Sequence, residues 1–188
     1  GEIESFTSSE ANAVFVDKDA FGFFNDNIKV GSVANSDNEF VSWGYWQNKD
    51  NKLGTFVVGQ KTLAINVPTN TVVNYSGSLL GSDIVQNSNN VMNLSLDFGA
   101  SSADFTSGDI HFDMSEGGSF AANINGGGFK DSSGFEITNA MTQNGGDFAL
   151  NSGALKGNYF GTNADAIGGT AKFESNTQQI NAVFSAKK

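Results

Sequence analysis

His111 is the residue of this sequence best suited to bind a metal, because it is the only histidine in a chain without cysteine. It lies between Asp109 and Asp113 in the sequence. An imidazole is a common axial ligand of haem iron, and a nearby carboxylate can orient the ring through its second nitrogen. The alternative is that His111 is an ordinary outward-facing residue of a β-strand. If His111 binds no metal, a tyrosine or a methionine would have to be the ligand.

A second group of residues with chemical potential lies in the N-terminal segment DKDAFGFFNDN. Phe21, Phe23 and Phe24 could form an apolar loop that closes over a planar ligand. Haem propionates require cations, and Lys18 is the nearest candidate in the sequence. Two alternatives remain open for these phenylalanines. They could form a plug that seats this segment on the rest of the protein, or an adhesive surface for a partner.

The charged residues exclude several classes of function. All ten basic residues are lysines, and the net charge is −10. Such an arginine-free, acidic chain is a poor binder of nucleic acid, whose phosphates need cations, and of anionic membranes. A single histidine without cysteine or arginine excludes Cys–His dyads, multi-histidine metal sites and arginine clamps. No apolar run approaches the ~18 residues of a membrane-spanning helix. We therefore expect a binding protein that is not an enzyme, binds no nucleic acid and does not insert into membranes.

The elements that must position these residues are β-strands. Short alternating runs, separated by clusters of glycine, asparagine, aspartate and serine, predict an all-β fold. We expect an eight-stranded antiparallel β-barrel over residues 39–188, preceded by an N-terminal extension or handle over residues 1–38. The candidate strands span residues 40–47, 71–80, 93–98, 109–115, 119–124, 134–139, 154–160, 170–174 and 179–186.

Alternation along two of these runs predicts which side chains face the core. Successive side chains of a strand point to opposite faces. Ile110 and Phe112 therefore take the inner face, and His111 lies outside. In the last run Phe184 faces inward and Ser185 faces outward.

Three segments carry a resemblance to a known family. They are FVSWGYWQN at residues 40–48, FVVGQKTLAINVPTNTVVNYSGSLLG at residues 56–81, and GNYFGTNADAIGGT at residues 157–170. In this order they resemble the transferrin-binding-protein-B-like β-barrels, and the resemblance covers residues 40–188. Three glycines of the third segment, Gly161, Gly168 and Gly169, are expected at tight chain reversals.

The resemblance implies a binding protein that is secreted, or displayed on the outer-membrane surface, by a Gram-negative bacterium. Its partners would be an outer-membrane translocon that exports it and a TonB-dependent receptor. A single barrel with an N-terminal extension is most similar to the hemophilin branch, which implies haem capture and delivery to that receptor. The alternative is a host-protein or host-surface interaction module, of the adhesin or immune-evasion type, without a small-molecule ligand.

Overall fold

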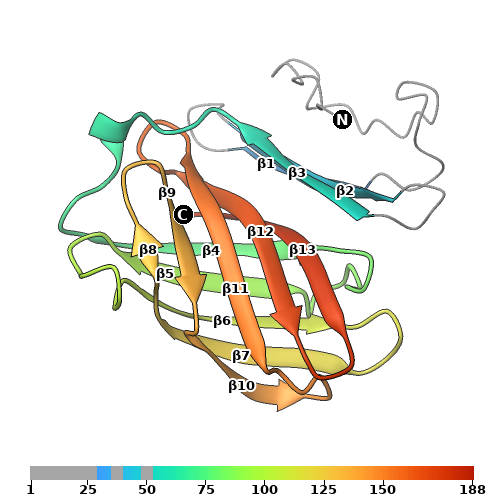
Figure 1. Cartoon of the computed structure of the whole chain (residues 1–188). Coiled ribbons are helices and arrows are strands. Elements are labelled where there is room, and N and C mark those ends of the chain that lie inside the picture. Colours follow the sequence, from blue (N-terminus) through green and yellow to red (C-terminus); the bar gives the residue numbers. More distant parts are fainter. Residues whose placement is uncertain (1–28, 35–39, 48–52) are drawn as a thin grey trace, which may run out of the picture.

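The computed structural model describes residues 29–34, 40–47 and 53–188. Within these ranges the chain forms thirteen β-strands and one turn of 3-10 helix, arranged as two sheets (Figure 1). The all-β class predicted from the sequence is confirmed. The predicted boundary between residues 38 and 39 falls within residues 35–39, outside the described residues.

The smaller sheet has three antiparallel strands in the order β1-β2-β3. They are β1 (Lys29–Ala34), β2 (Phe40–Gln47) and β3 (Leu53–Gly59). This sheet lies across the outer face of the larger sheet, over β12 and β13 (Figure 1). We call it the handle sheet. Residues 40–47 form a strand as predicted, but the strand belongs to the handle sheet and not to the barrel.

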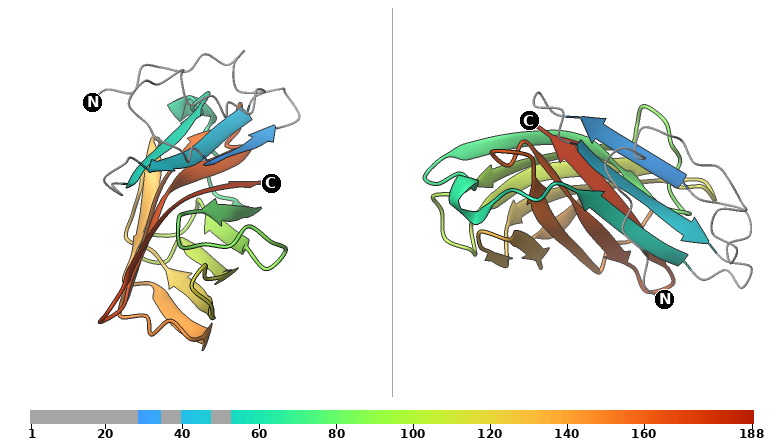
Figure 2. Two further views of the ribbon diagram at one scale, coloured as in Figure 1. Left: turned by 90° about the vertical axis from the view of Figure 1, so that its right-hand side faces the viewer. Right: turned by 90° about the horizontal axis from the view of Figure 1, so that it is seen from above.

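The larger sheet has ten antiparallel strands in the order β10-β7-β6-β5-β4-β13-β12-β11-β9-β8. It curls strongly, so that its two halves face each other (Figure 2). The predicted number of eight barrel strands is therefore wrong for the described residues. The strands are β4 (Val72–Leu80), β5 (Val91–Asp97), β6 (Thr106–Asp113), β7 (Ser119–Gly126), β8 (Phe129–Lys130), β9 (Gly134–Thr138), β10 (Met141–Gly146), β11 (Ser152–Phe160), β12 (Ala166–Glu174) and β13 (Gln179–Lys187).

The two halves of the curled sheet meet through side chains near β10. The Oε1 atom of Gln143 accepts a hydrogen bond from the Leu150 N–H at 3.0 Å. A Cβ atom on Gly153 of β11 would lie only 2.3 Å from Sδ of Met141, so the methionine fills the space that the glycine leaves. In the described chain, backbone pairing joins β10 to β7 and β8 to β9. These contacts give an incompletely paired barrel.

Phenyl rings fill much of the interior of the curled sheet. Phe112, Phe120 and Phe173 come from three different strands and are fully buried, with ring centroids 4.8 to 5.6 Å apart. Each buried aromatic ring removes a large apolar area from water. Ile110 and Phe184 are also buried in this core, so the predicted inner faces are confirmed.

The handle sheet buries part of the barrel's outer face. Ser185 points outward as predicted, yet its exposed fraction is 0%. Its hydroxyl donates to the Ile167 carbonyl at 3.1 Å. Beside it, Val183 of β13 packs against Trp43 and Tyr45 of β2. Alternation predicts on which side of its sheet a side chain lies, but not whether a second sheet covers that side.

Candidate functional site

The structure tests the predicted ligand residues only in part. Phe21, Phe23, Phe24 and Lys18 lie outside the described residues. His111 lies in β6 and points outward, half-buried between its neighbours on the adjacent strands. Across residues 29–34, 40–47 and 53–188, no group of three or more histidine, cysteine, aspartate or glutamate side chains could hold a metal ion. A role of His111 in haem binding stays a prediction.

One of the two aspartates that flank His111 in this strand, Asp113, has other partners. The Oδ2 atom of Asp113 accepts hydrogen bonds from the side-chain amides of Asn87 at 2.8 Å and Asn89 at 2.9 Å. These two bonds hold the pKa of Asp113 below its usual value, and the nearby His111 lowers it slightly further. Asp113 is thus engaged by a neighbouring loop.

One end of the barrel combines four connecting segments with exposed apolar side chains. The segments are residues 60–71, 98–105, 126–133 and 161–165, and we call them together the loop end (Figure 1, left). The large apolar side chains that are exposed in the described chain lie in or beside these segments. They are Leu63, Ile65, Val72 and Phe129, with exposed fractions of 68%, 90%, 55% and 55%.

Thr62 fastens the first of these segments to the turn between β11 and β12. Its buried hydroxyl donates to the Gly161 carbonyl at 2.7 Å and accepts the Ala164 N–H at 3.2 Å. The backbone is joined at the same place, because the Thr62 N–H donates to Tyr159 and the Gly161 N–H donates to Gln60. Leu63, which follows Thr62 directly, is therefore presented to solvent from an anchored backbone.

Two buried tyrosines hold the loop end from inside the barrel. The hydroxyl of Tyr75 donates to the Ala164 carbonyl at 2.8 Å, and that of Tyr159 donates to the Gly134 carbonyl at 3.3 Å. Ala164 has a φ of +56°, a left-handed conformation that is uncommon for a residue with a Cβ atom. Burial raises the pKa of both tyrosines, with nearby acidic groups as a lesser cause. Both hydroxyls thus stay protonated and act as donors at neutral pH.

Lys130 connects two further segments of the loop end. Its ammonium group donates to the Asp97 carbonyl at 2.7 Å and lies 6.0 Å and 5.7 Å from the ring centroids of Phe98 and Phe105. The cation is thus attracted by the faces of both rings. Partial burial lowers the pKa of Lys130. Phe129, its neighbour in β8, is exposed beside this cluster.

The glycines at residues 157–170, the third segment of the family resemblance, differ in part from their expected conformation. Gly161 has a φ of +85° and turns the chain, as predicted. Gly168 and Gly169 lie inside β12, so the expectation of tight reversals there is wrong. A Cβ atom on Gly169 would lie 1.9 Å from the Lys156 carbonyl oxygen, and one on Gly168 would lie 3.0 Å from Val57 of the handle sheet. These two glycines allow close approach of neighbouring strands.

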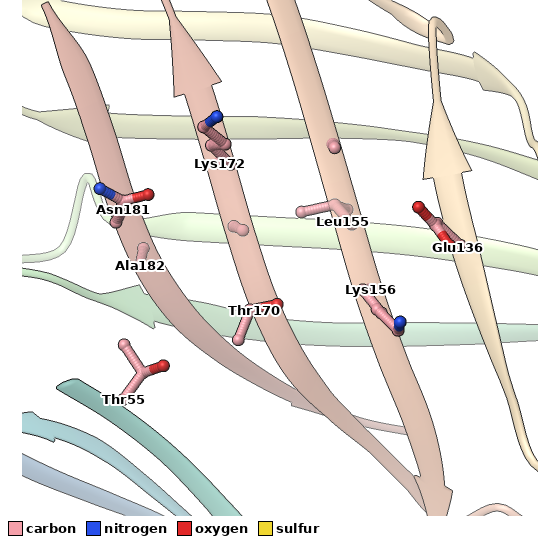
Figure 3. A pocket seen from close by; sticks show the side chains of 10 residues that line it. Thr55, Glu136, Leu155, Lys156, Thr170, Lys172, Asn181 and Ala182 are labelled. Carbon is pink, nitrogen blue, oxygen red and sulfur yellow. The ribbon is translucent and has the colours of Figure 1, made fainter.

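A shallow groove of about 450 Å³ lies where the edge of the handle sheet meets the barrel wall. Figure 3 shows Lys156, Lys172 and Glu136 beside it, with Thr55 on the handle side. Lys172 forms an ion pair with Glu174 of its own strand. Charges of both signs therefore border the groove, and no single ligand chemistry is favoured.

The apolar residues of the loop end were not singled out from the sequence. Leu63 and Ile65 belong to the run TLAINV, which lies between the candidate strands at residues 40–47 and 71–80. A run of apolar residues in a connector is a signal that could have identified them, because connectors are usually polar.

A sequence profile of one family matches this chain over residues 67–188, which include all ten strands of the curled sheet and most of the loop end. The family is described as the C-lobe and N-lobe β-barrels of Tf-binding protein B. The chain belongs to this family. The match covers well over half of the residues, and it concerns a family of binding-protein barrels. It gives no support to the hemophilin branch in particular.

Solved structures that resemble this chain have low sequence identity to it. A protein named Surface Lipoprotein aligns with 100% of this chain and 90% of its own, at 18% identity and a TM-score of 0.52. A TbpB variant from Haemophilus parasuis Hp5 aligns with 85% of this chain and 37% of its own, at 16% identity and a TM-score of 0.48. A TbpB variant from Actinobacillus pleuropneumoniae H49 aligns with 100% of this chain and 87% of its own, at 16% identity and a TM-score of 0.49.

The present chain thus spans little more than a third of the H. parasuis protein. Among curated proteins, none matches this chain significantly. In the described part of the chain, no helix has the length and apolar character needed to cross a membrane.

Proposed function

We propose that this protein is a non-enzymatic binding protein of the bacterial cell surface that recognises a host protein through its loop end. The observation that carries the proposal is the gathering of Leu63, Ile65, Val72 and Phe129 at one end of the barrel. Membership of the Tf-binding protein B barrel family supports a binding role. The names of the solved relatives, a surface lipoprotein and transferrin-binding vaccine antigens, support the location and the host partner.

The energetics of the exposed side chains favour a protein partner. Exposed apolar groups of this size cost free energy in water, and burying one of them fully contributes about 1.5–3 kcal/mol. Exposed apolar groups gathered at one place on a soluble protein mark interaction sites. The anchoring by Thr62, Tyr75 and Tyr159 fixes the backbone beneath them before binding. Less conformational entropy is then lost when a partner docks.

The charge of the chain indicates what kind of partner surface would associate fastest. A net charge of −10 attracts basic surfaces over a distance of several ångströms. This attraction acts mainly on the association rate and weakens with salt. A basic host protein surface surrounding an apolar pocket therefore fits the loop end and the chain as a whole. By family resemblance, a translocon and an outer-membrane receptor would be its bacterial partners.

The test is to compare Leu63→Ser/Ile65→Ser with the unchanged protein in binding to purified transferrins, haemoglobin and fractionated host serum. The matched control is Asn74→Ser/Ser107→Ala, which changes two exposed residues on the barrel wall. We expect at least a tenfold loss of affinity for the loop-end variant, because two apolar contacts are removed. The control should bind normally. Equal binding by both variants, or binding of no host protein, would contradict the proposal.

Haem capture is the competing prediction, and hemin titration separates the two. His-ligated haem gives a shifted Soret band that His111→Ala abolishes. A band that requires His111, together with no host-protein binding, would replace the present proposal by haem capture.

A further inference from the structure

The chain contains two Asn-Gly pairs, Asn125–Gly126 and Asn144–Gly145, and both asparagines are exposed. In such a pair the glycine amide nitrogen can attack Cγ of the preceding asparagine. The missing Cβ atom of glycine leaves that nitrogen accessible and its backbone pliable. The reaction requires the backbone to leave its extended conformation. Local structure therefore decides which of the two pairs reacts.

Asn125 lies in a strand that is paired on both sides. β7 has β6 on one side and β10 on the other. Asn125 aligns with Ser107 across the ladder, and its N–H donates to the Ala140 carbonyl at 2.9 Å. The space at Gly126 is limited, because a Cβ atom there would lie 3.2 Å from the Ala103 carbonyl oxygen.

Asn144 is held much less firmly. It lies in β10, at the end of the sheet, where the register with β7 shifts between Gln143 and Gly145. Asn144 is the extra residue of this β-bulge, and a bulge interrupts the regular ladder. A Cβ atom on Gly145 would have only the Ala121 Cβ within 4 Å, at 3.7 Å, so there is room for the backbone to move.

We propose that Asn144 is a site of spontaneous deamidation, and that the fold itself makes it more reactive than Asn125. The Gly145 nitrogen loses its hydrogen and forms a bond to Cγ of Asn144, the Cγ–Nδ2 bond breaks, and Nδ2 takes up one hydrogen and leaves as ammonia. The resulting succinimide ring takes up one water molecule and opens to aspartate or isoaspartate. No oxidant, metal or other co-reactant is needed.

The conversion changes the outer wall of the barrel. In the asparagine form, Nδ2 of Asn144 donates to Oδ1 of Asn123 at 3.1 Å. A carboxylate has no hydrogen to donate at that position, and its oxygen would face another oxygen. The product also adds one negative charge to a chain whose net charge is −10. Isoaspartate inserts a methylene group into the backbone of β10, beside the contacts that bring the two halves of the barrel together.

Peptide mapping by mass spectrometry after incubation of the folded protein at mildly alkaline pH tests this proposal. We expect Asn144 to convert about tenfold faster than Asn125, a ratio that corresponds to about 1.4 kcal/mol of extra opening free energy at Asn125. The same incubation in concentrated urea is the control. There the two pairs should convert at similar rates, because no fold restrains either of them.

Two variants sharpen the result. Asn144→Gln lengthens the side chain, disfavours the five-membered ring, and should leave only the slow conversion at Asn125. Asn125→Gln should leave the fast conversion at Asn144 unchanged. The proposal is overturned if the folded protein converts Asn125 at the same rate as Asn144 or faster. It is equally overturned if Asn144 stays intact in the folded protein while the urea sample converts.

Discussion

At the residue scale, the loop end depends on a few buried polar atoms that act on Ala164 from two sides. Thr62 accepts its N–H and Tyr75 donates to its carbonyl, so the unusual φ of +56° is held by two hydrogen bonds. Polar atoms in such a site contribute stability mainly because leaving a partner unsatisfied is costly. Ionisation of the Tyr75 hydroxyl would remove one of the two hydrogen bonds that hold Ala164 in this conformation.

Alkaline pH should destabilise the protein through its tyrosines. Burial raises the pKa of Tyr75 above the usual 10.0, with Tyr159 and Asp165 as smaller causes. The unfolded chain releases these protons at lower pH than the folded chain. The tyrosines' contribution to the free energy of unfolding is therefore fully present below about pH 10. It falls as pH rises above that value, by up to about 1.4 kcal/mol per pH unit for each such tyrosine.

Urea unfolding curves from about pH 8 to about pH 12 measure this effect. Tyr75→Phe should be less stable by about 0.5–1.5 kcal/mol at pH 8, because one hydrogen bond is lost. Its stability should also fall less steeply above pH 10, because one titrating group is missing. A flat stability profile of the unchanged protein across this range would refute the expectation.

At the element scale, the strands with clear alternation could be predicted and the irregular ones could not. The predicted run at residues 179–186 lies within β13, and its inner face is that seen in the structure. β10 has the sequence MTQNGG, which contains one large apolar residue and so no alternation. β8 has two residues, fewer than any periodicity needs. The exposed Leu63 and Ile65 were missed because alternation identifies cores, not surfaces.

The glycines of β12 show why a motif can be found and still be misinterpreted. GG dipeptides are common in turns, so Gly168 and Gly169 were expected at reversals. In the structure both residues are extended. Glycine is needed at these positions because Val57 of the handle sheet and Lys156 of the adjacent strand approach too closely for a Cβ atom. Such close approaches depend on tertiary packing and leave no local signal.

Gly169→Ala should therefore destabilise the protein although alanine is a small residue. Its Cβ atom would meet the Lys156 carbonyl oxygen at 1.9 Å, and that oxygen belongs to the backbone of the adjacent strand. We expect a loss of about 1–3 kcal/mol in the free energy of unfolding, as for other overpacked sites. Gly145→Ala is the control, because its Cβ atom would make only an ordinary contact with the Ala121 Cβ at 3.7 Å, and it should change stability by less than about 0.5 kcal/mol. Equal stability of the two variants would contradict the interpretation.

At the scale of the whole molecule, two sheets share one buried interface. Trp43 and Tyr45 of the handle sheet pack on Leu80 and Val183 of the curled sheet, and their exposed fractions do not exceed 9%. Val41 packs in a second cluster with Phe160 and Ala166. Because neither surface would be stable in water alone, the handle sheet and the barrel should unfold together.

Tryptophan fluorescence and circular dichroism can test this coupling separately. Both tryptophans of the chain, Trp43 and Trp46, lie in β2, so fluorescence reports on the handle sheet. Circular dichroism reports chiefly on the ten-stranded sheet. We expect coincident unfolding curves for the unchanged protein, the signature of a two-state transition.

Gly168→Val should separate the two curves, because its side chain would meet Val41 and Val57 of the handle sheet. Thr170→Val, a change at the next outward position of β12, should leave them coincident. Separate transitions in the unchanged protein would show that the interface does not couple the sheets.

The central position of β13 has a consequence for the time course of biosynthesis. In the hydrogen-bonded order of the described strands, β13 alone joins β10, β7, β6, β5 and β4 to β12, β11, β9 and β8, and it is the last of the thirteen strands along the chain. A polypeptide that emerges N-terminus first therefore keeps the two halves of its sheet apart until residues 179–187 become available. Pairings between strands so distant in sequence also form slowly. Until then neither half of the sheet has its central partner strand, so the curled sheet closes only after residues 179–187 have emerged.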